Sequence, residues 1–324
     1  MSGNNETIKM NTENSIDNKF IDPHVTAKGE ARGYIDFVGF KNLWFNTGTL
    51  CNLTCDNCYI ESSPKNDRLS YLTKEDVNPF LDEIKSNSLK SCSVDTIGFT
   101  GGEPFLNPNM IEILELVLKY GFRALVLTNG VNVISRVSEK LETLNKTYPN
   151  QLRLRISLDH YTKEVHEKER GENTFQKAID SLKWLSEKHI HISIAGRSLL
   201  NENIELAQLG FQKLISDNGI DLKLTAENLV IFPEMDLNRE VPEITTQCFD
   251  ILNVKPEHQM CASERMVVKK KNNDKPTVMP CTLLAYDPQF ELGETLKDSQ
   301  KRVFLNHKFC AEFCILGGAS CSST

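Results

Sequence analysis

Three cysteines stand close together near the start of the chain. The stretch GTLCNLTCDNCY places Cys51, Cys55 and Cys58 within eight residues and follows them with Tyr59. Cysteine thiolates are nucleophiles and soft metal ligands, so this spacing indicates redox chemistry or a metal. A structural zinc ion takes four protein ligands, and here the fourth would have to come from a distant part of the chain. A redox dithiol of Cys55 and Cys58 would leave Cys51 unexplained.

Three thiolates also suit a cubane of four irons. Ferredoxin-type clusters are closed by four thiolates, whereas three leave one iron without a protein ligand. Such an open iron is a coordination site for a substrate or a cofactor. The count of three therefore favours a cluster that does chemistry, while zinc and the dithiol stay open as alternatives.

The elements that must position these cysteines are strands and helices in regular alternation. Strands are predicted at 43–48, 96–102, 122–130, 152–159, 190–196 and 222–232. Helices are predicted at 72–87, 109–121, 132–147, 174–189 and 203–218. Parallel strands need a crossover helix, so six strands in regular alternation with helices indicate an α/β fold, a partial (β/α)6 TIM-like barrel. In barrels of this kind the chemistry sits on the loops that leave the carboxyl ends of the strands.

Further motifs occupy those strand ends. The cysteines follow the first strand, and Gly101-Gly102-Glu103-Pro104 follows the second. Later strand ends carry Asn129, Ser157 with Asp159, and Arg197. Glycines let the backbone approach a ligand closely, and a carboxylate suits an ammonium group. Each of the later polar residues could equally be an ordinary strand-end cap.

Cys51-x3-Cys55-x2-Cys58 followed by an aromatic residue resembles the signature of the radical S-adenosylmethionine enzymes, and the resemblance covers about residues 42–232. It implies a 4Fe-4S cluster whose open iron is chelated by S-adenosylmethionine. One electron then cleaves the sulfonium to give a 5′-deoxyadenosyl radical, which abstracts a hydrogen atom from the substrate. The family's partial (β/α)6 barrel agrees with the fold predicted from the strand count.

The same resemblance implies roles for the strand-end residues. Gly101, Gly102 and Glu103 look like the family's GGE motif, which holds the amino group of S-adenosylmethionine. Tyr59 is the aromatic residue beside the cluster. The remaining implied cofactor contacts are Asn129 near the adenosine, Ser157 and Asp159 near the ribose and carboxylate, and Arg197 near the methionyl carboxylate. Arg170-Gly171 resembles the family's turn before the next helix.

A second group of cysteines lies near the C-terminus. Strand-like stretches on either side of Asn272-Asn273-Asp274 predict a β-hairpin that brings Cys261 and Cys281 toward each other. This cysteine-rich extension looks like the SPASM or twitch extension of the same superfamily. The resemblance implies one auxiliary 4Fe-4S cluster, held by Cys261, Cys281 and two of Cys310, Cys314 and Cys321. Zinc and reduced core thiols are the alternatives, and Cys92 and Cys248 have no partner at ligand spacing.

Composition limits the classes of function. A net charge of −7 argues against non-specific nucleic-acid binding. There is no run of 18 apolar residues and no apolar signal segment, so we expect no membrane partner and a cytoplasmic location, with the ten cysteines reduced. The expected organisation is a polar N-terminal arm (1–38), a radical SAM core (39–235) and an iron–sulfur extension (236–324).

The sequence thus predicts a radical SAM enzyme that acts on a peptide or a small molecule and receives electrons from a reductase such as flavodoxin or ferredoxin. Only about 40 residues precede the first strand, which is short for a separate peptide-recognition domain. The alternatives are a non-enzymatic iron–sulfur electron carrier and a zinc-binding scaffold protein.

Overall fold

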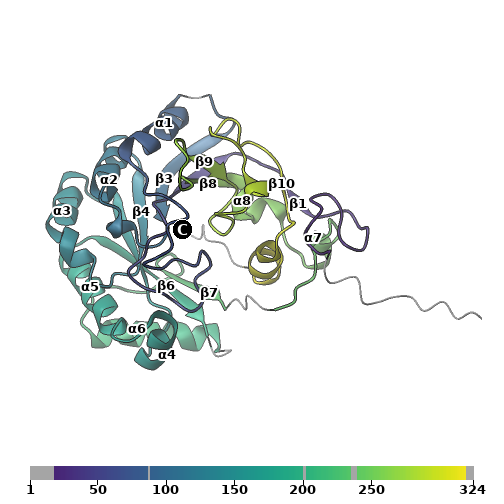
Figure 1. The fold of residues 1–324 in the computed structure, drawn as a ribbon. Coiled ribbons are helices and arrows are strands. Elements are labelled where there is room, and N and C mark those ends of the chain that lie inside the picture. Colours follow the sequence, from purple (N-terminus) through teal and green to yellow (C-terminus); the bar gives the residue numbers. More distant parts are fainter. Residues whose placement is uncertain (1–17, 87, 200–201, 235–238, 319–324) are drawn as a thin grey trace, which may run out of the picture.

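A computed structural model describes residues 18–86, 88–199, 202–234 and 239–318. Its centre is a curved sheet of six parallel strands in the spatial order β7-β6-β5-β4-β3-β2 (Figure 1). The strands are β2 (Phe40–Asn46), β3 (Cys92–Thr100), β4 (Arg123–Thr128), β5 (Leu152–Ser157), β6 (His191–Ser198) and β7 (Leu229–Pro233). The predicted α/β partial barrel is therefore confirmed.

Helices line the outer face of this sheet and form the crossovers between its strands (Figure 1). They are α1 (Lys74–Lys85), α2 (Met110–Lys119), α3 (Ile134–Thr147), α4 (Lys163–Arg170), α5 (Phe175–Glu187) and α6 (Ile204–Asp217). The expected cap of α1 is present, because Thr73 Oγ1 accepts from the Asp76 amide at 3.3 Å and the Asp76 carboxylate accepts from the Thr73 amide at 2.9 Å.

Two sequence predictions need correction. The last strand was predicted from residue 222, but β7 begins at Leu229 because Thr225 and Asn228 form a turn, in which the Asn228 side chain accepts from the Thr225 amide at 2.7 Å. Helix α4 was not predicted at all. Its sequence KEVHEKER has no apolar stripe, and its buried residues are His166 and Glu169. Hydrophobic periodicity cannot detect a helix of this kind.

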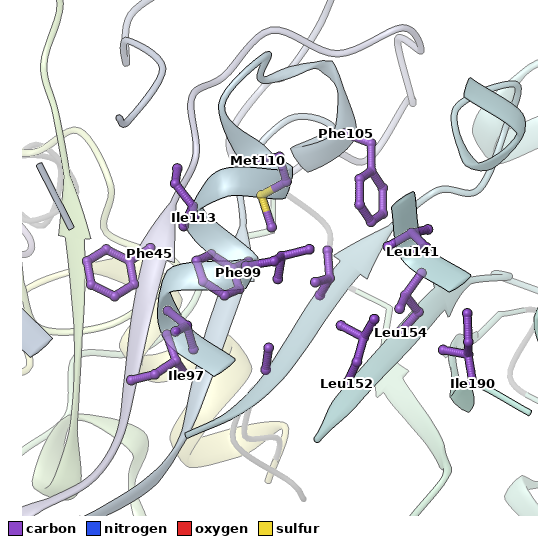
Figure 2. Close-up of a cluster of buried hydrophobic side chains, with 14 of the residues drawn as sticks. Phe45, Ile97, Phe99, Phe105, Met110, Ile113, Leu141, Leu152, Leu154 and Ile190 are labelled. Atoms are coloured by element: carbon purple, nitrogen blue, oxygen red, sulfur yellow. The ribbon is translucent and has the colours of Figure 1, made fainter. Parts of the chain in front are cut away.

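The main core lies between the sheet and the helices (Figure 2). Phe45, Ile97 and Phe99 from β2 and β3 pack there with Met110 and Ile113 from α2. The rings of Phe45 and Phe99 stack with centroids 5.9 Å apart. Burial of this large apolar face fixes the strand order, and with it the positions of the loops at the carboxyl edge.

The C-terminal segment extends the same sheet. Strand β8 (Glu264–Val268) pairs in parallel with β2, and β9 (Thr277–Met279) pairs antiparallel with β8. This confirms the predicted hairpin and joins it to the barrel. The other short elements of this part are α7 (Cys248–Ile251), η2 (Pro256–His258), α8 (Met260–Ser263), η3 (Pro288–Phe290) and the π-helical turn η4 (Cys310–Leu316).

The described part of the N-terminal arm is docked on the extension. Strand β1 (Tyr34–Ile35) pairs antiparallel with β10 (Val303–Phe304), and the buried side chains of Arg32 and Glu243 form an ion pair at 2.6 Å. Among the described residues, no helix has the length and apolar character needed to cross a membrane.

Candidate functional site

The three N-terminal cysteines line one cavity at the carboxyl edge of the sheet. The cavity has a volume of about 190 Å³, and Cys51, Cys55 and Cys58 reach it from the loop that follows β2. Backbone amides already point at two of the sulfur atoms: Leu53 N–H donates to Cys51 Sγ at 3.4 Å and Ser62 N–H to Cys58 Sγ at 3.3 Å. These donors favour the thiolate form that a metal ligand requires.

Burial opposes that form as long as no cation is bound. It raises the pKa of the Cys51 thiol to about 12 and also raises the pKa of Cys55. Three thiolates in this cavity therefore need a compensating positive charge, which metal ions supply.

The glycine turn after β3 is packed directly against the start of the cysteine loop. Gly102 N–H donates to the Gly48 carbonyl at 2.8 Å, and Glu103 N–H donates to the Leu50 carbonyl at 3.0 Å. A Cβ atom at Gly102 would lie 2.2 Å from the Leu50 carbonyl oxygen, and Gly101 has a φ of +135°. The turn thus has room only for glycines, and both of them line the cavity.

Glu103 is buried and is not among the residues that line the cavity. Its buried carboxylate accepts hydrogen bonds from Thr128 Oγ1 and the Asn129 amide, both at 2.8 Å, and from the Phe105 amide at 3.1 Å. Burial raises its pKa to about 7. In this structure the hydrogen bonds of Glu103 connect the segment after β3 to the end of β4.

Asn129 links the third strand end to the cysteine loop. Its side-chain amide donates to Asn52 Oδ1 at 2.9 Å and lies 3.7 Å from Cys51 Sγ, while its oxygen accepts from the Val131 amide at 2.8 Å. Asn129 and Ser157 both line the cavity. Asn129, which the sequence singled out, therefore lies beside Cys51 and lines the same cavity as the three cysteines.

Asp159 is the centre of a buried charge network. It pairs with Arg170, whose Nε lies 2.8 Å from Oδ2 and whose Nη2 lies 2.9 Å from Oδ1, and with Arg197 Nε at 3.4 Å. Burial alone would raise the pKa of Asp159, but the two guanidinium groups hold it below its usual value. Arg170 also brings Nη1 to 4.0 Å from Cys55 Sγ, so a positive charge lies beside a cysteine of the loop.

Arg197 connects β6 to the cysteine loop and to α4. It donates to the Asn57 carbonyl at 3.2 Å, lies 3.4 Å from the Glu169 carboxylate and stands over the Tyr59 ring at 5.5 Å. Glu169 in turn accepts from the Asn57 side chain at 2.9 Å. The unpredicted helix α4 therefore contacts the cysteine loop through Glu169 and Arg170.

The cavity gathers cysteines and strand-end residues that the sequence singled out from five separate segments of the chain. It also contains residues that sequence analysis missed, among them Asn46, Thr128, Thr282, Leu283 and Phe313. Three of these come from the C-terminal part, and their approach to the barrel has no signal in local sequence pattern. Asn46 and Thr128 are polar residues at strand ends and could have been found by that position.

A second, smaller cavity of about 30 Å³ collects four C-terminal cysteines. These are Cys261, Cys281, Cys310 and Cys314. Burial raises the pKa of Cys261 to about 11 and that of Cys281 to about 12, and it raises the pKa of Cys310 well above its usual value. The predicted Cys321 lies outside the described residues. Leu283 and Phe313 line both cavities, so the two cysteine groups share a wall.

The remaining two cysteines line neither of these cavities. Cys92 lies in β3 and packs at the edge of the core, and Cys248 Sγ accepts from the Thr245 amide at 3.3 Å. In the described part of the chain, no three His, Cys, Asp or Glu side chains converge on a point that would hold a single metal ion.

Residues 45–206 match the family model described as the radical SAM superfamily. The chain belongs to this superfamily. It is 31% identical over 271 residues to the antilisterial bacteriocin subtilosin biosynthesis protein AlbA of Bacillus subtilis, a match that covers 78% of this chain and 57% of AlbA. It is 30% identical over 124 residues to the putative peptide biosynthesis protein YydG of the same organism, covering 37% of this chain and 36% of YydG. The chain thus matches little more than half the length of these curated relatives, or less.

Solved structures agree with the fold. Streptococcus suis SuiB bound to S-adenosylmethionine superimposes with a TM-score of 0.55 at 14% identity, covering 87% of this chain and 68% of SuiB. SuiB has also been solved with its precursor peptide SuiA. At this identity the likeness shows that the radical SAM partial barrel is shared.

Proposed function

We propose that this chain is a radical SAM enzyme that modifies a peptide substrate by hydrogen abstraction. The observation that carries the proposal is the convergence of Cys51, Cys55 and Cys58 with the glycine turn and three further strand ends on one cavity. An electron carrier or a zinc scaffold has no use for this arrangement, since neither needs a cofactor site beside its metal.

The donor set fits a cluster with one open iron. Two sulfur atoms already receive backbone hydrogen bonds, and Arg170 places a cation near the third. When bound, the 4Fe-4S cluster and S-adenosylmethionine supply one-electron cleavage of the sulfonium to a 5′-deoxyadenosyl radical. The protein's own contribution is to hold and orient the nucleotide and to exclude water.

Within this proposal, Gly101 and Gly102 present backbone to the nucleotide because any side chain there would collide with the cysteine loop. Asn129, directly after β4, and Ser157, the last residue of β5, offer polar groups to the cavity. Arg197 is the cation available for a carboxylate, and Asp159 fixes its position. Glu103 acts by holding Thr128 and the Asn129 backbone in place.

We further propose that Cys261, Cys281, Cys310 and Cys314 hold one auxiliary 4Fe-4S cluster. All four line a single apolar cavity, and Cys310 and Cys314 lie one helical turn apart on η4. Cys321, as the fifth candidate, is then dispensable. The two cavities share a wall, so the auxiliary cluster would lie close to the first cavity. There it could accept the electron left after product formation or contact the substrate directly.

A peptide is the favoured substrate because YydG is named for peptide biosynthesis, AlbA is named for bacteriocin biosynthesis, and SuiB was solved with a precursor peptide. The reducing electron would come from a flavodoxin or ferredoxin. The most direct search for the substrate is a short open reading frame beside the gene.

The test is anaerobic reconstitution with iron and sulfide, then reduction with dithionite in the presence of S-adenosylmethionine. We expect release of 5′-deoxyadenosine and about eight irons per chain, as two cubanes require. Cys51→Ala should abolish cleavage, Cys310→Ala should leave about four irons, and Cys248→Ala is the matched control with no loss. Stable clusters without cleavage would instead identify an electron carrier, and zinc without iron a scaffold.

A further inference from the structure

Arg265 on β8 is a fully buried guanidinium with an unusual set of partners. Its Nη1 donates to the carbonyls of Cys261 at 2.6 Å and Glu264 at 2.7 Å. Its Nε donates to the Ser299 carbonyl and its Nη2 to the Lys301 carbonyl, both at 3.0 Å. Every acceptor is a neutral backbone oxygen.

No carboxylate of the described residues forms an ion pair with this guanidinium. The nearest in sequence is Glu264, whose carboxylate accepts instead from Asn42 Nδ2 at 2.8 Å and Trp44 Nε1 at 2.6 Å. Arg32 in the same part of the molecule is also buried, but it forms an ion pair with Glu243 and so shows what a compensated arginine looks like in this protein. A buried cation with no counter-charge costs several kcal/mol, so the site lacks an anion.

Arg265 lies beside the second cysteine cavity, because its Nη1 donates to the carbonyl of Cys261, which lines that cavity together with Cys281. A guanidinium stays protonated in proteins, so Arg265 is charged at neutral pH. Neutral thiols cannot balance this charge. Four thiolates around a 4Fe-4S core carry a net negative charge in both of its common oxidation states, and they would balance it.

We propose that Arg265 is the counter-charge of the auxiliary cluster and raises its reduction potential. The proposal rests on the auxiliary cluster of the proposed function. A fixed positive charge in an apolar pocket favours the state that carries one more electron, and cluster potentials respond to nearby charge and to solvent exclusion. Arg265 thus tunes the reduction potential of the auxiliary cluster. A higher potential lets this cluster accept the electron that is left after product formation.

The test isolates the auxiliary cluster in the full-length Cys51→Ala, Cys55→Ala, Cys58→Ala variant. An anaerobic dithionite titration followed by electron paramagnetic resonance measures its midpoint potential. In this background we expect Arg265→Met to shift the one-electron reduction equilibrium at least tenfold toward the oxidised cluster, which is about 59 mV. Arg265→Lys keeps the charge and should stay close to the parent value.

A second variant covers the case in which Arg265→Met fails to fold or to load iron. The Phe37 ring lies under the guanidinium, 4.4 Å from its carbon, and is only half-buried. Phe37→Glu places a carboxylate there while Arg265 keeps its four carbonyl partners. Phe37→Glu should lower the midpoint potential of the auxiliary cluster, as Arg265→Met does, and Phe37→Leu should leave it unchanged.

Each outcome has a distinct meaning. A parent variant that binds no iron, or binds zinc, overturns the auxiliary cluster and this proposal with it. A loaded cluster whose potential is the same in the parent, Arg265→Met and Phe37→Glu overturns the tuning role alone. Equal shifts in Arg265→Lys and Arg265→Met would assign the effect to lost hydrogen bonds and also overturn it.

Discussion

Arg170 joins the cysteine loop to the end of β5 through one guanidinium, which pairs with Asp159 and approaches Cys55. Arg170→Met leaves the Asp159 carboxylate buried with the weaker Arg197 contact alone. We expect a loss of about 3 kcal/mol in the free energy of unfolding, because breaking a buried pair exposes one charge to an apolar surrounding. We also expect at least a tenfold loss of 5′-deoxyadenosine formation. Lys168→Met, an exposed position on the same helix, is the control and should change neither.

A normal unfolding transition and full iron content in Arg170→Met would contradict this role. If Arg170→Lys restores stability but not cleavage, the planar fork of the guanidinium is what the site requires, since lysine supplies charge without two parallel donors.

Glu103 makes stability depend on pH in a sense opposite to that of most carboxylates. Its folded-state pKa of about 7 lies above the ordinary value of 4.5, so the folded chain retains a proton that the unfolded chain has lost. Stability therefore falls as pH rises from about 4.5 to about 7, by roughly 3 kcal/mol at about 1.4 kcal/mol for each pH unit. Denaturant titrations of the metal-free protein across this range should show the fall.

His166 changes the stability with pH in the opposite direction to Glu103. The measurement must therefore compare the parent protein with a Glu103 variant. Burial lowers the pKa of His166 to about 4, and its contribution to stability rises with pH from about 4 to about 6.5. Glu103→Gln removes only the Glu103 part, and the difference between the two proteins isolates it. A difference that stays constant from pH 4.5 to 7 would show that Glu103 titrates normally.

At the level of elements, the contact between the glycine turn and the cysteine loop is the closest in the site. Gly102→Ala forces a Cβ against the Leu50 carbonyl and should separate the turn from the loop. We expect at least a tenfold weaker affinity for S-adenosylmethionine, measured by calorimetry on the reconstituted protein. Gly121→Ala is a suitable control, because it has a φ of +82° but no neighbour within 4 Å and should cost about 1 kcal/mol of stability with no effect on binding. Unchanged affinity in Gly102→Ala would place the nucleotide elsewhere.

The elements also show what sequence could and could not reveal. Strongly apolar strands and amphipathic helices gave the barrel, and strand ends then located Asn129, Ser157, Asp159 and Arg197, because parallel strands bring their carboxyl ends to one edge. Helix α4 was not predicted, because its contacts are ionic and hydrophobic periodicity does not detect them. Phe313 was not predicted either. Its place in the cavity wall depends on long-range packing, which no local sequence pattern encodes.

For the molecule as a whole, the important contact is between β2 and β8. The predicted boundary between 235 and 236 separates the core from the extension, and β8 of the extension hydrogen-bonds to β2 of the core along four residues. We expect the full chain to unfold in a single cooperative transition. A chain ended after residue 243 would expose the β2 edge and should be insoluble or unfolded, as judged by circular dichroism.

Glu264→Ala tests the same joint without shortening the chain. It leaves the buried Trp44 Nε1–H without its carboxylate acceptor, and an unsatisfied buried donor costs about 1–3 kcal/mol. Because β8 and β2 belong to one sheet, that loss should lower the midpoint of the whole transition, followed by both tryptophan fluorescence and far-ultraviolet circular dichroism. Glu264→Gln keeps an acceptor oxygen and should recover part of the loss. Two separated transitions, with the barrel's own midpoint unchanged in Glu264→Ala, would mean that the extension folds independently and that its cysteines reach the barrel only by docking.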